Sequence, residues 1–562
     1  RKEHVGWLSL PRKDQLFILF FVRFSEPVVK ASISTYLYYQ LKSLDPSLSS
    51  PEIIRQSATL QTAFIISQCI SSLFLGRLAD SPKGGRKLVL LIGMTGSLIS
   101  CVAFGFIRHF YQALILYTLE GAFNGNVATV RTMVSEVVQE KRQVFVFQVR
   151  AFVLLPIAFN VAVLLSPLMA GQLADLRGRY PDRFRNSWFL EKFPYAPPAL
   201  ENGIIVFTAS LIVFFFLEEG EADLIVWLKT SKVVGRRHDP GLAAAQKLKS
   251  LLCFSSSGSP TYTLVNNNND RTSEVIEEVP LMVEDGTEPE SQPSSPQLSE
   301  RICEIQTKQK HTKILPLRRI LTRNLCFMLM AVAVHDGHIS VYNTLWPNFL
   351  SDPVIDDAHA QTPAQQRHLP FRFSGGAGMA PADIAWSLAL LGVMGLPIQL
   401  FAHPRVTQRL GTLRTWRFFL RFFPIVYTVV PYIAVMPSTT HPPAGKHGFA
   451  VWALIVFSQA LLVGCSTFTA PSQLILTNLT SSASPHPSAL ARTNSMSYLI
   501  TAMVRAISSA VSAWIYSYGS SHGLTGLAWW LTGVVSVCGY LLSLFCKEGN
   551  GHEILLSGDE EI

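Results

Sequence analysis

Apolar stretches of membrane-spanning length alternate with short basic segments along this chain of 562 residues. A helix that crosses a bilayer needs roughly 20 mostly apolar residues. The expected spans are residues 15–41, 54–75, 88–107, 111–133, 152–173 and 203–217, followed by residues 325–350, 384–401, 418–435, 450–476, 489–516 and 524–545. This pattern predicts an all-α integral membrane protein with twelve transmembrane helices, six on each side of a polar central segment.

The central segment, residues 218–317, has a different composition. It contains an asparagine run at 266–269, an acidic stretch at 274–290 and a Ser/Pro-rich stretch at 291–299. Such a segment cannot bury an apolar core, so we expect a mostly disordered cytoplasmic linker. The predicted organisation is a cytoplasmic segment (1–14), a six-helix half (15–217), the linker (218–317), a second six-helix half (318–546) and a cytoplasmic tail (547–562). Two halves of similar design are typical of secondary transporters.

Composition supports this class. Hydrophobic residues make up 49% of the chain and charged residues 15%, whereas soluble globular proteins carry about 25% charge. The net charge of +9 would indicate nucleic-acid binding in a soluble protein. Here the basic residues flank apolar spans, where they determine topology. We therefore expect a bilayer and a small molecule as partners, no nucleic acid, and a monomer. The eight cysteines show no C-x-x-C pairing, so neither a disulfide framework nor a zinc site is predicted.

Basic clusters before the first span and after the second, fourth and eighth spans predict that both termini are cytoplasmic. One loop opposes this topology, because residues 173–203 contain five basic residues. The sequence does not distinguish the plasma membrane from the vacuolar membrane.

A glycine-rich basic loop joins the second and third spans. It reads Gly76-Arg77-Leu78-Ala79-Asp80-Ser81-Pro82-Lys83-Gly84-Gly85-Arg86-Lys87. This loop resembles the signature G-x-L-a-D-x-x-G-R-K of the major facilitator superfamily, with two extra residues after the aspartate. The resemblance implies a gating role for Gly76, Asp80, Gly85, Arg86 and Lys87.

The resemblance covers nearly the whole chain. Its shorter matches are Arg23-Phe24-Ser25-Glu26-Pro27, Asn124-Gly125-Asn126, Phe193-Pro194-Tyr195, Leu476-Thr477-Asn478, Arg505 and Gly526-Leu527-Ala528-Trp529-Trp530. Together they are similar to the branch of fungal and plant drug:proton antiporters and zinc-induced-facilitator-like transporters. That branch implies proton-driven export. This chain departs from it at Tyr117, where the family usually has an arginine tied to proton coupling, and at Ser166-Pro167 and Ala170-Gly171 in the fifth span.

Charged and polar residues inside several spans indicate a site, because charges in hydrocarbon are costly and usually functional. The candidate cavity residues are Arg23, Glu26, Lys30, Glu120, Asn124, Asn126, His335, Asp336, His338 and Arg505. A structural ion pair or polar helix contact is the alternative for each of them. Four such faces, on the first, fourth, seventh and eleventh spans, favour a polar cavity shared by the two halves.

Helical rise places Glu26 and Asp336 at matching depths, so both carboxylates are expected near the midplane. Lys30 and Glu120 also share a level, which leads to the hypothesis of an ion pair between them. The alternative is that Lys30 pairs with Glu26, one turn away. His335 and His338 share a helix face and invite a metal hypothesis, but no second cluster supplies further ligands. Polar lining or a proton relay is favoured, and neither a metal nor a cofactor is expected.

A multi-pass secondary transporter working by alternating access is the leading interpretation, with proton-coupled efflux as its finer form. An uptake or facilitated transporter without proton coupling, and a transport-inactive membrane sensor, remain open alternatives. An enzyme is not expected, because no Walker loop, H-E-x-x-H or nucleophile motif occurs.

Overall fold

The computed structural model describes residues 12–79, 85–124, 129–130, 133–134, 144–218, 320–355, 367–441, 444–480 and 487–548. Within these ranges the regular structure is helical, and β-pairing is limited to isolated bridges. The predicted linker lies outside the described residues except for Glu218.

The N-terminal half contains the six expected helices, and they surround an apolar core. They are α1 (Lys13–Leu44), α2 (Ser50–Ala79), α3 (Arg86–Phe104), α4 (Phe110–Phe123), α6 (Val144–Leu173) and α10 (Ala196–Phe216). The Gln15 side chain near the start of α1 bonds the Phe216 carbonyl (3.1 Å) and the Glu218 amide (3.0 Å) at the end of α10. The half therefore begins and ends at one end of the bundle, which we call the linker end. The opposite end, where α1 and α6 terminate, we call the loop end.

The C-terminal half repeats this plan, although two of its spans are irregular. Its elements are α15 (Arg323–Ser351), α16 (Pro381–Pro397), the π-turn η4 (Ile398–Ala402), α17 (His403–Leu410), α18 (Thr412–Leu420), α19 (Phe423–Val429), the 3₁₀ turn η5 (Val430–Val435), α20 (Phe449–Leu479), α21 (Pro487–Ser521) and α22 (Leu527–Ser543). The eighth span thus runs from α16 through η4 into α17. The ninth span, expected as one helix over 418–435, comprises α18, α19 and η5, because Pro424 and Pro431 lack the amide hydrogens that a continuous helix needs.

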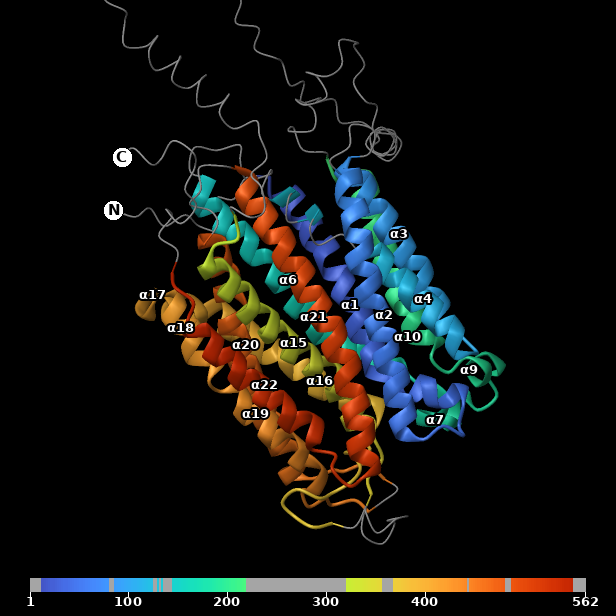
Figure 1. The fold of residues 1–562 in the computed structure, drawn as a ribbon. Helices are drawn as coiled ribbons and strands as arrows, with labels where there is room; N and C mark the ends of the chain where they lie inside the picture. Colours follow the sequence, from blue (N-terminus) through green and yellow to red (C-terminus); the bar gives the residue numbers. More distant parts are fainter. Residues whose placement is uncertain are drawn as a thin grey trace, which may run out of the picture.

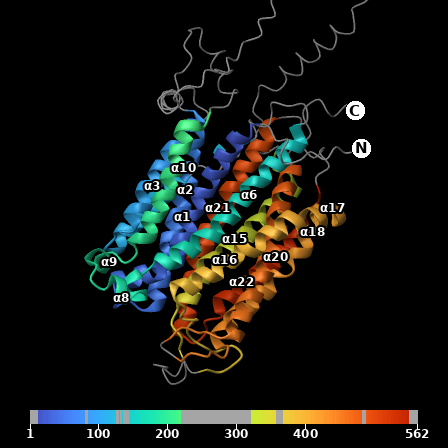
Figure 2. The same cartoon turned by 180° about the vertical axis from the view of Figure 1, so that it is seen from behind.

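The two halves pack against each other through two pairs of helices. Helix α6 packs on α16 and α2 packs on α21, as the two views of the fold show (Figures 1 and 2). Gly392 of α16 permits the first of these contacts, because a Cβ there would lie 2.5 Å from the Leu164 side chain. The halves therefore meet along two seams.

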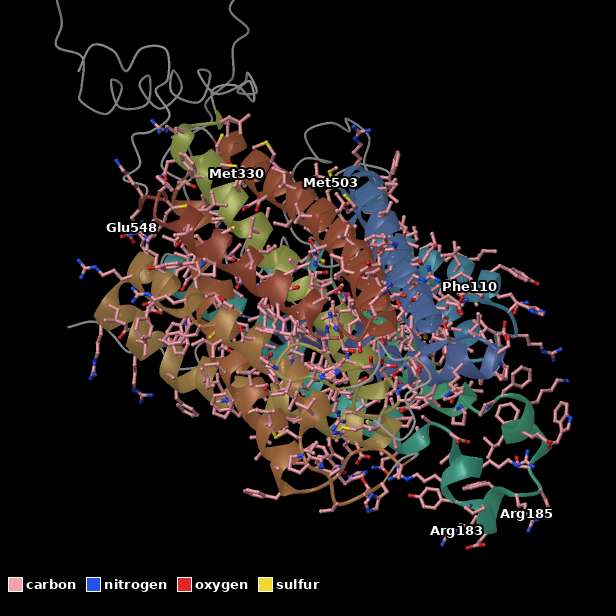
Figure 3. The ribbon with its side chains drawn as sticks, turned by 60° about the horizontal axis from the view of Figure 1, so that its bottom comes forward. Phe110, Arg183, Arg185, Met330, Met503 and Glu548 are labelled. Atoms are coloured by element: carbon pink, nitrogen blue, oxygen red, sulfur yellow. The ribbon has the colours of Figure 1, made fainter. Side chains whose placement is uncertain are left out.

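The outside of the bundle is apolar. Met330 and Met503 are 45% and 60% exposed and point outward in Figure 3. Eight of the described helices are long and apolar enough to cross a membrane. These features confirm the predicted all-α integral membrane fold with twelve spans.

The structure corrects the sixth span and defines the loop before it. Helix α10 begins at Ala196, seven residues before the expected start at Gly203, and has proline in its first turn, where the missing amide hydrogen costs nothing. The basic loop forms three short helices, α7 (Leu176–Arg179), α8 (Pro181–Phe184) and α9 (Trp188–Lys192). Arg183 and Arg185 project from this loop-end segment in Figure 3. An Arg177–Glu191 ion pair of 3.2 Å offsets part of its positive charge.

The structure describes the two ends of the predicted gating loop. Gly76 lies in the last turn of α2, and Gly85 precedes α3 with a φ of 98°, a conformation that favours glycine. Arg86 and Lys87 open α3 and are buried. Asp80 lies outside the described residues.

Candidate functional site

Arg23 and Glu26 form an ion pair on α1. The Arg23 Nη1 to Glu26 Oε2 distance is 2.6 Å, and the side chains are 16% and 22% exposed. Their i, i+3 spacing places both on one face of the helix. The Arg23 guanidinium also lies over the Phe159 ring of α6, 5.6 Å from its centroid. The charge of Glu26 is therefore compensated within its own helix.

Lys30, one turn further along α1, is exposed although its neighbours Val28 and Val29 are buried. Its Nζ lies over the Phe64 ring of α2, 5.3 Å from the centroid. No carboxylate among the described residues lies within the 4 Å of an ion pair with Lys30. A cation–π contact thus takes the place of both expected partners, Glu120 and Glu26.

Glu120 of α4 faces the interior of the N-terminal half. It is 4% exposed and accepts a hydrogen bond of 2.6 Å from the Ser97 hydroxyl of α3. The hypothesis of a Lys30–Glu120 ion pair is wrong for this structure. Helical rise fixes only the depth of a residue, whereas Glu120 turns toward α3 and Lys30 toward α2.

Asn124 ends α4. Its carbonyl and its side-chain oxygen accept hydrogen bonds from the Gln68 amide of α2, at 2.8 and 3.2 Å. Tyr117, two turns earlier, packs its ring on Phe64 and Phe104. Both residues therefore hold the half together, and Asn126 lies outside the described residues.

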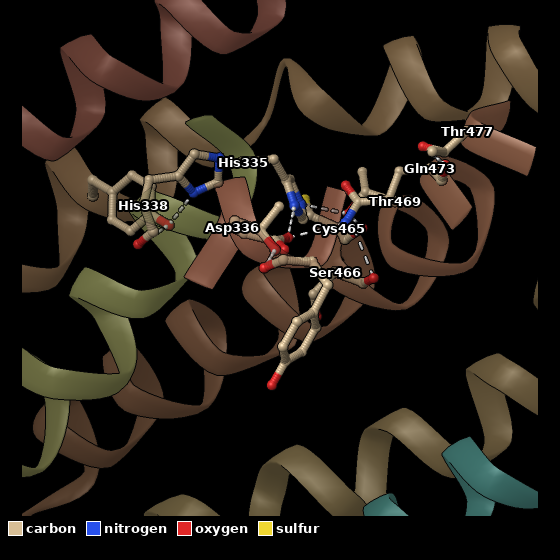
Figure 4. A network of polar contacts seen from close by, with 11 residues as sticks. His335, Asp336, His338, Cys465, Ser466, Thr469, Gln473 and Thr477 are labelled. Atoms are coloured by element: carbon tan, nitrogen blue, oxygen red, sulfur yellow. Dashed lines mark hydrogen bonds and ion pairs between the residues drawn. The ribbon is translucent and has the colours of Figure 1, made fainter. Parts of the chain in front are cut away.

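On α15, Asp336 lies in a hydrogen-bond network with α20 (Figure 4). Asp336 Oδ1 accepts from the Gln473 amide at 3.0 Å and lies 3.3 Å from His335 Nδ1. The Nε2 atom of His335 lies 3.0 Å from the Thr469 hydroxyl. Asp336 is 27% exposed, while His335 is buried behind it. The carboxylate is thus held by the Gln473 amide and the His335 imidazole.

His338 points away from this network, as Figure 4 shows. Its Nδ1 lies 2.8 Å from the Tyr427 hydroxyl of α19. The two imidazole rings are 5.0 Å apart and nearly perpendicular, and each contacts the Phe423 ring. Within the described residues no three His, Cys, Asp or Glu side chains are grouped as metal ligands would be. The histidines serve the packing of α15 on α19 and α20.

Arg505 of α21 lies between the charges of the two halves. It interacts electrostatically with Lys30 and with Asp336. Next to it, the Ala506 carbonyl accepts a hydrogen bond of 3.4 Å from Thr62 of α2, two residues from Phe64. The Arg505 Nε atom is buried and has no hydrogen-bond partner among the residues that the structure describes. We call Arg23, Glu26, Lys30, Asp336 and Arg505 the polar centre.

The polar centre occupies the middle of the bundle. At 1.5 Å per residue, Lys30, Asp336 and Arg505 lie about 21, 22 and 24 Å from the loop-end termini of their helices. Charges at this depth would be costly in hydrocarbon and are tolerated inside a bundle. Arg505 of the eleventh span thus interacts electrostatically with charges of the first and seventh spans, while Glu120 of the fourth span is buried and bonded to Ser97.

The sequence did not indicate several residues that contact the candidate site residues. Phe64, Ser97, Tyr427, Thr469 and Gln473 each contact a candidate residue directly. Thr469 and Gln473 are polar residues at i, i+4 in an apolar span, a signal that predicts an inward-facing stripe. Phe64 and Tyr427 carry no comparable signal.

Relatives of this chain are transporters. The Major Facilitator Superfamily multidrug transporter mfsB of Aspergillus fumigatus is 28% identical over 554 residues, covering 96% of this chain and 84% of that protein. Protein ZINC INDUCED FACILITATOR-LIKE 1 of Arabidopsis thaliana is 22% identical over 198 residues, covering 35% of this chain and 40% of that protein. The predicted resemblance to this branch is therefore confirmed.

Solved structures agree on the fold. A D-xylose-proton symporter matches with a TM-score of 0.60 at 11% identity, covering 96% of this chain and 99% of the symporter. The family model of the Major Facilitator Superfamily matches residues 16–335, more than half of the chain. With twelve spans in two halves around a polar centre, this protein belongs to the Major Facilitator Superfamily.

Proposed function

We propose that this protein exports a small organic solute by alternating access, with both termini in the cytoplasm and proton movement as the driving reaction. The observation that carries the proposal is the polar centre, which is assembled from both halves at mid-depth. A site there can open to either side of the membrane when the halves rock about it. The name of the Aspergillus relative, a multidrug transporter, supports export of organic compounds.

The interface between the halves supports a state closed at the loop end. The Tyr39 hydroxyl of α1 donates a hydrogen bond to the Met379 carbonyl before α16. Thr344 bonds Gln61 at 2.9 Å, and Asn348 bonds Ser57 at 3.2 Å. With cytoplasmic termini, the loop end faces the extracytoplasmic side, so we expect the polar centre to be reached from the cytoplasm in this state.

Proton coupling is assigned to Glu26 and Asp336, because both are partly exposed carboxylates at the polar centre. Each has a partner that stabilises its ionised form, so release of that partner during the transport cycle would favour protonation. His335 is positioned to receive or pass on a proton from Asp336.

The test is flux in proteoliposomes. The purified full chain is reconstituted, and uptake and efflux of a compound panel are measured with and without a pH gradient. We expect substrate-dependent flux that is accelerated by the gradient and loses this acceleration in the Glu26→Gln, Asp336→Asn double variant. Gradient-independent flux would favour a facilitated transporter. Binding without any flux would favour a sensor.

A further inference from the structure

Lys30 is a cation in the middle of the bundle, and no carboxylate of the described residues lies at contact distance from it. Its ammonium group lies over the Phe64 ring, and the residue as a whole is exposed. A cation–π contact covers one side of an ammonium group and leaves its remaining hydrogen-bond donors available. An ion pair would be the usual way to lower the cost of such a charge.

Arg505 adds a second cation beside the first. Its guanidinium group interacts electrostatically with Lys30. The Thr62–Ala506 hydrogen bond brings α21 against α2 close to the ring on which Lys30 lies. Within the described part of the chain, Arg505 also forms no ion pair within 4 Å, and its buried Nε donates to no acceptor.

The acids of the polar centre are already engaged. Glu26 is held by Arg23 at 2.6 Å, and Asp336 accepts a hydrogen bond from Gln473 and contacts His335. The five residues of the polar centre comprise three basic side chains, those of Arg23, Lys30 and Arg505, and two carboxylates, so this group carries one positive charge in excess. Neighbouring cations repel each other, and a bound anion would relieve that repulsion.

We propose that Lys30 and Arg505 together bind the anionic group of the substrate, and that this substrate is a small organic anion with an aromatic or apolar body. This inference rests on the proposed transport function and adds its substrate class. Arg505 offers planar guanidinium donors and Lys30 a point charge, a combination suited to a carboxylate or sulfonate. Phe64 offers a ring beside the anion site for the apolar body.

A matched series of probes tests the charge requirement. Binding of 2-naphthoate, 2-naphthamide and 2-naphthylmethylammonium to the detergent-solubilised full chain is measured by calorimetry. The three probes share one ring system and differ in charge. We expect naphthoate to bind at least about tenfold more tightly than the other two, since a charge-assisted contact contributes more than a neutral one. Equal binding of all three, or preference for the ammonium probe, overturns the proposal.

Variants locate the site. Lys30→Met and Arg505→Met should each weaken naphthoate binding about tenfold or more. Neither variant should change the weak binding of naphthamide. Lys30→Arg should retain naphthoate binding, because it keeps the positive charge. Arg55→Met is the matched control, because Arg55 is an exposed cation at the loop end that pairs with Glu52 at 3.8 Å. Unchanged naphthoate binding in a folded Lys30→Met and a folded Arg505→Met places the anion elsewhere and rejects the proposal. If neither variant folds, the comparison of the three probes on the unaltered chain still shows whether the site prefers an anion.

The same protein separates this inference from the transport function. Flux of a neutral or cationic compound, with no binding of naphthoate, rejects the anion site and keeps the transporter. Specific naphthoate binding with no flux of any compound rejects transport and keeps the site.

Discussion

Thr344 of α15 donates a hydrogen bond of 2.9 Å to the side-chain oxygen of Gln61 on α2, across the interface between the two halves. One turn closer to the loop end, the Asn348 amide donates to the Ser57 hydroxyl at 3.2 Å. The two pairs lie on the same faces of the same helices. They therefore stabilise the closed loop end directly.

Asn348→Ala should shift the population toward an open loop end. Loss of one buried hydrogen bond changes the free-energy difference between the two states by about 0.5–1.5 kcal/mol, a roughly two- to thirteenfold change in the equilibrium. Spin labels at the exposed positions Arg55 and Ser521 would report the opening as a longer distance component. Thr428→Ala serves as control, because that hydroxyl is exposed and bonds only the Pro424 carbonyl of its own helix. Equal distance distributions in the unaltered chain, Asn348→Ala and Thr428→Ala would show that the Asn348–Ser57 hydrogen bond does not stabilise the closed loop end.

The Arg23–Glu26 pair should show strong coupling in a double-variant cycle. Arg23→Met leaves the Glu26 carboxylate in the bundle without its cation, which we expect to cost about 2 kcal/mol, below the cost for a fully buried pair. Adding Glu26→Gln should recover most of that loss. Unfolding by denaturing detergent measures the stability of the unaltered chain, the two single variants and the double variant. Additive losses of stability would show that the two charges act independently.

The buried Glu120 carboxyl group should be stabilised by Ser97 and not by Lys30. Because the Ser97 hydroxyl is the hydrogen-bond partner of the buried carboxyl group, Ser97→Ala should destabilise the protein by about 1–3 kcal/mol. Glu120→Gln should be tolerated better, since an amide oxygen still accepts that bond. Thermal unfolding of Lys30→Met, Glu120→Gln and the double variant should give additive shifts. A clear rescue in the double variant would restore the ion-pair hypothesis.

Asp352 should make closure of the loop end dependent on pH. It lies just beyond α15, is 2% exposed and accepts a hydrogen bond of 2.9 Å from the Tyr516 hydroxyl of α21. Burial raises the pKa of Asp352 to about 6, and Tyr516 and Ser50 by hydrogen bonds and Lys42 by its charge oppose that rise. Tyr38 and Tyr39 of α1 also face this carboxylate.

The direction of this pH dependence follows from the raised pKa of Asp352. The protonated carboxyl group is the form that burial favours, so its contribution to the closed state is complete below about pH 4 and is lost as the pH rises through about 6. The closed population at pH 5 should therefore exceed that at pH 7.5, measured with the same spin labels. Asp352→Asn should remove this difference, and Asp383→Asn should keep it. A pH dependence that survives Asp352→Asn would point to another group.

The sequence by itself determined the class, the number of spans and the common helix face of Arg23 and Glu26. These are local properties: apolar length decides whether a segment spans a bilayer, and an i, i+3 spacing places two side chains together on any helix. Composition likewise separated the two halves from the polar segment between them.

Only the tertiary structure decided the partners of Lys30 and Glu120. Sequence position sets the depth of a residue along its helix, and here those depths agree. The contact is set by how each helix is rotated about its own axis and by which neighbour packs on that side. Lys30 meets Phe64 of α2, and Glu120 meets Ser97 of α3, because packing against different helices turns two residues of equal depth in different directions.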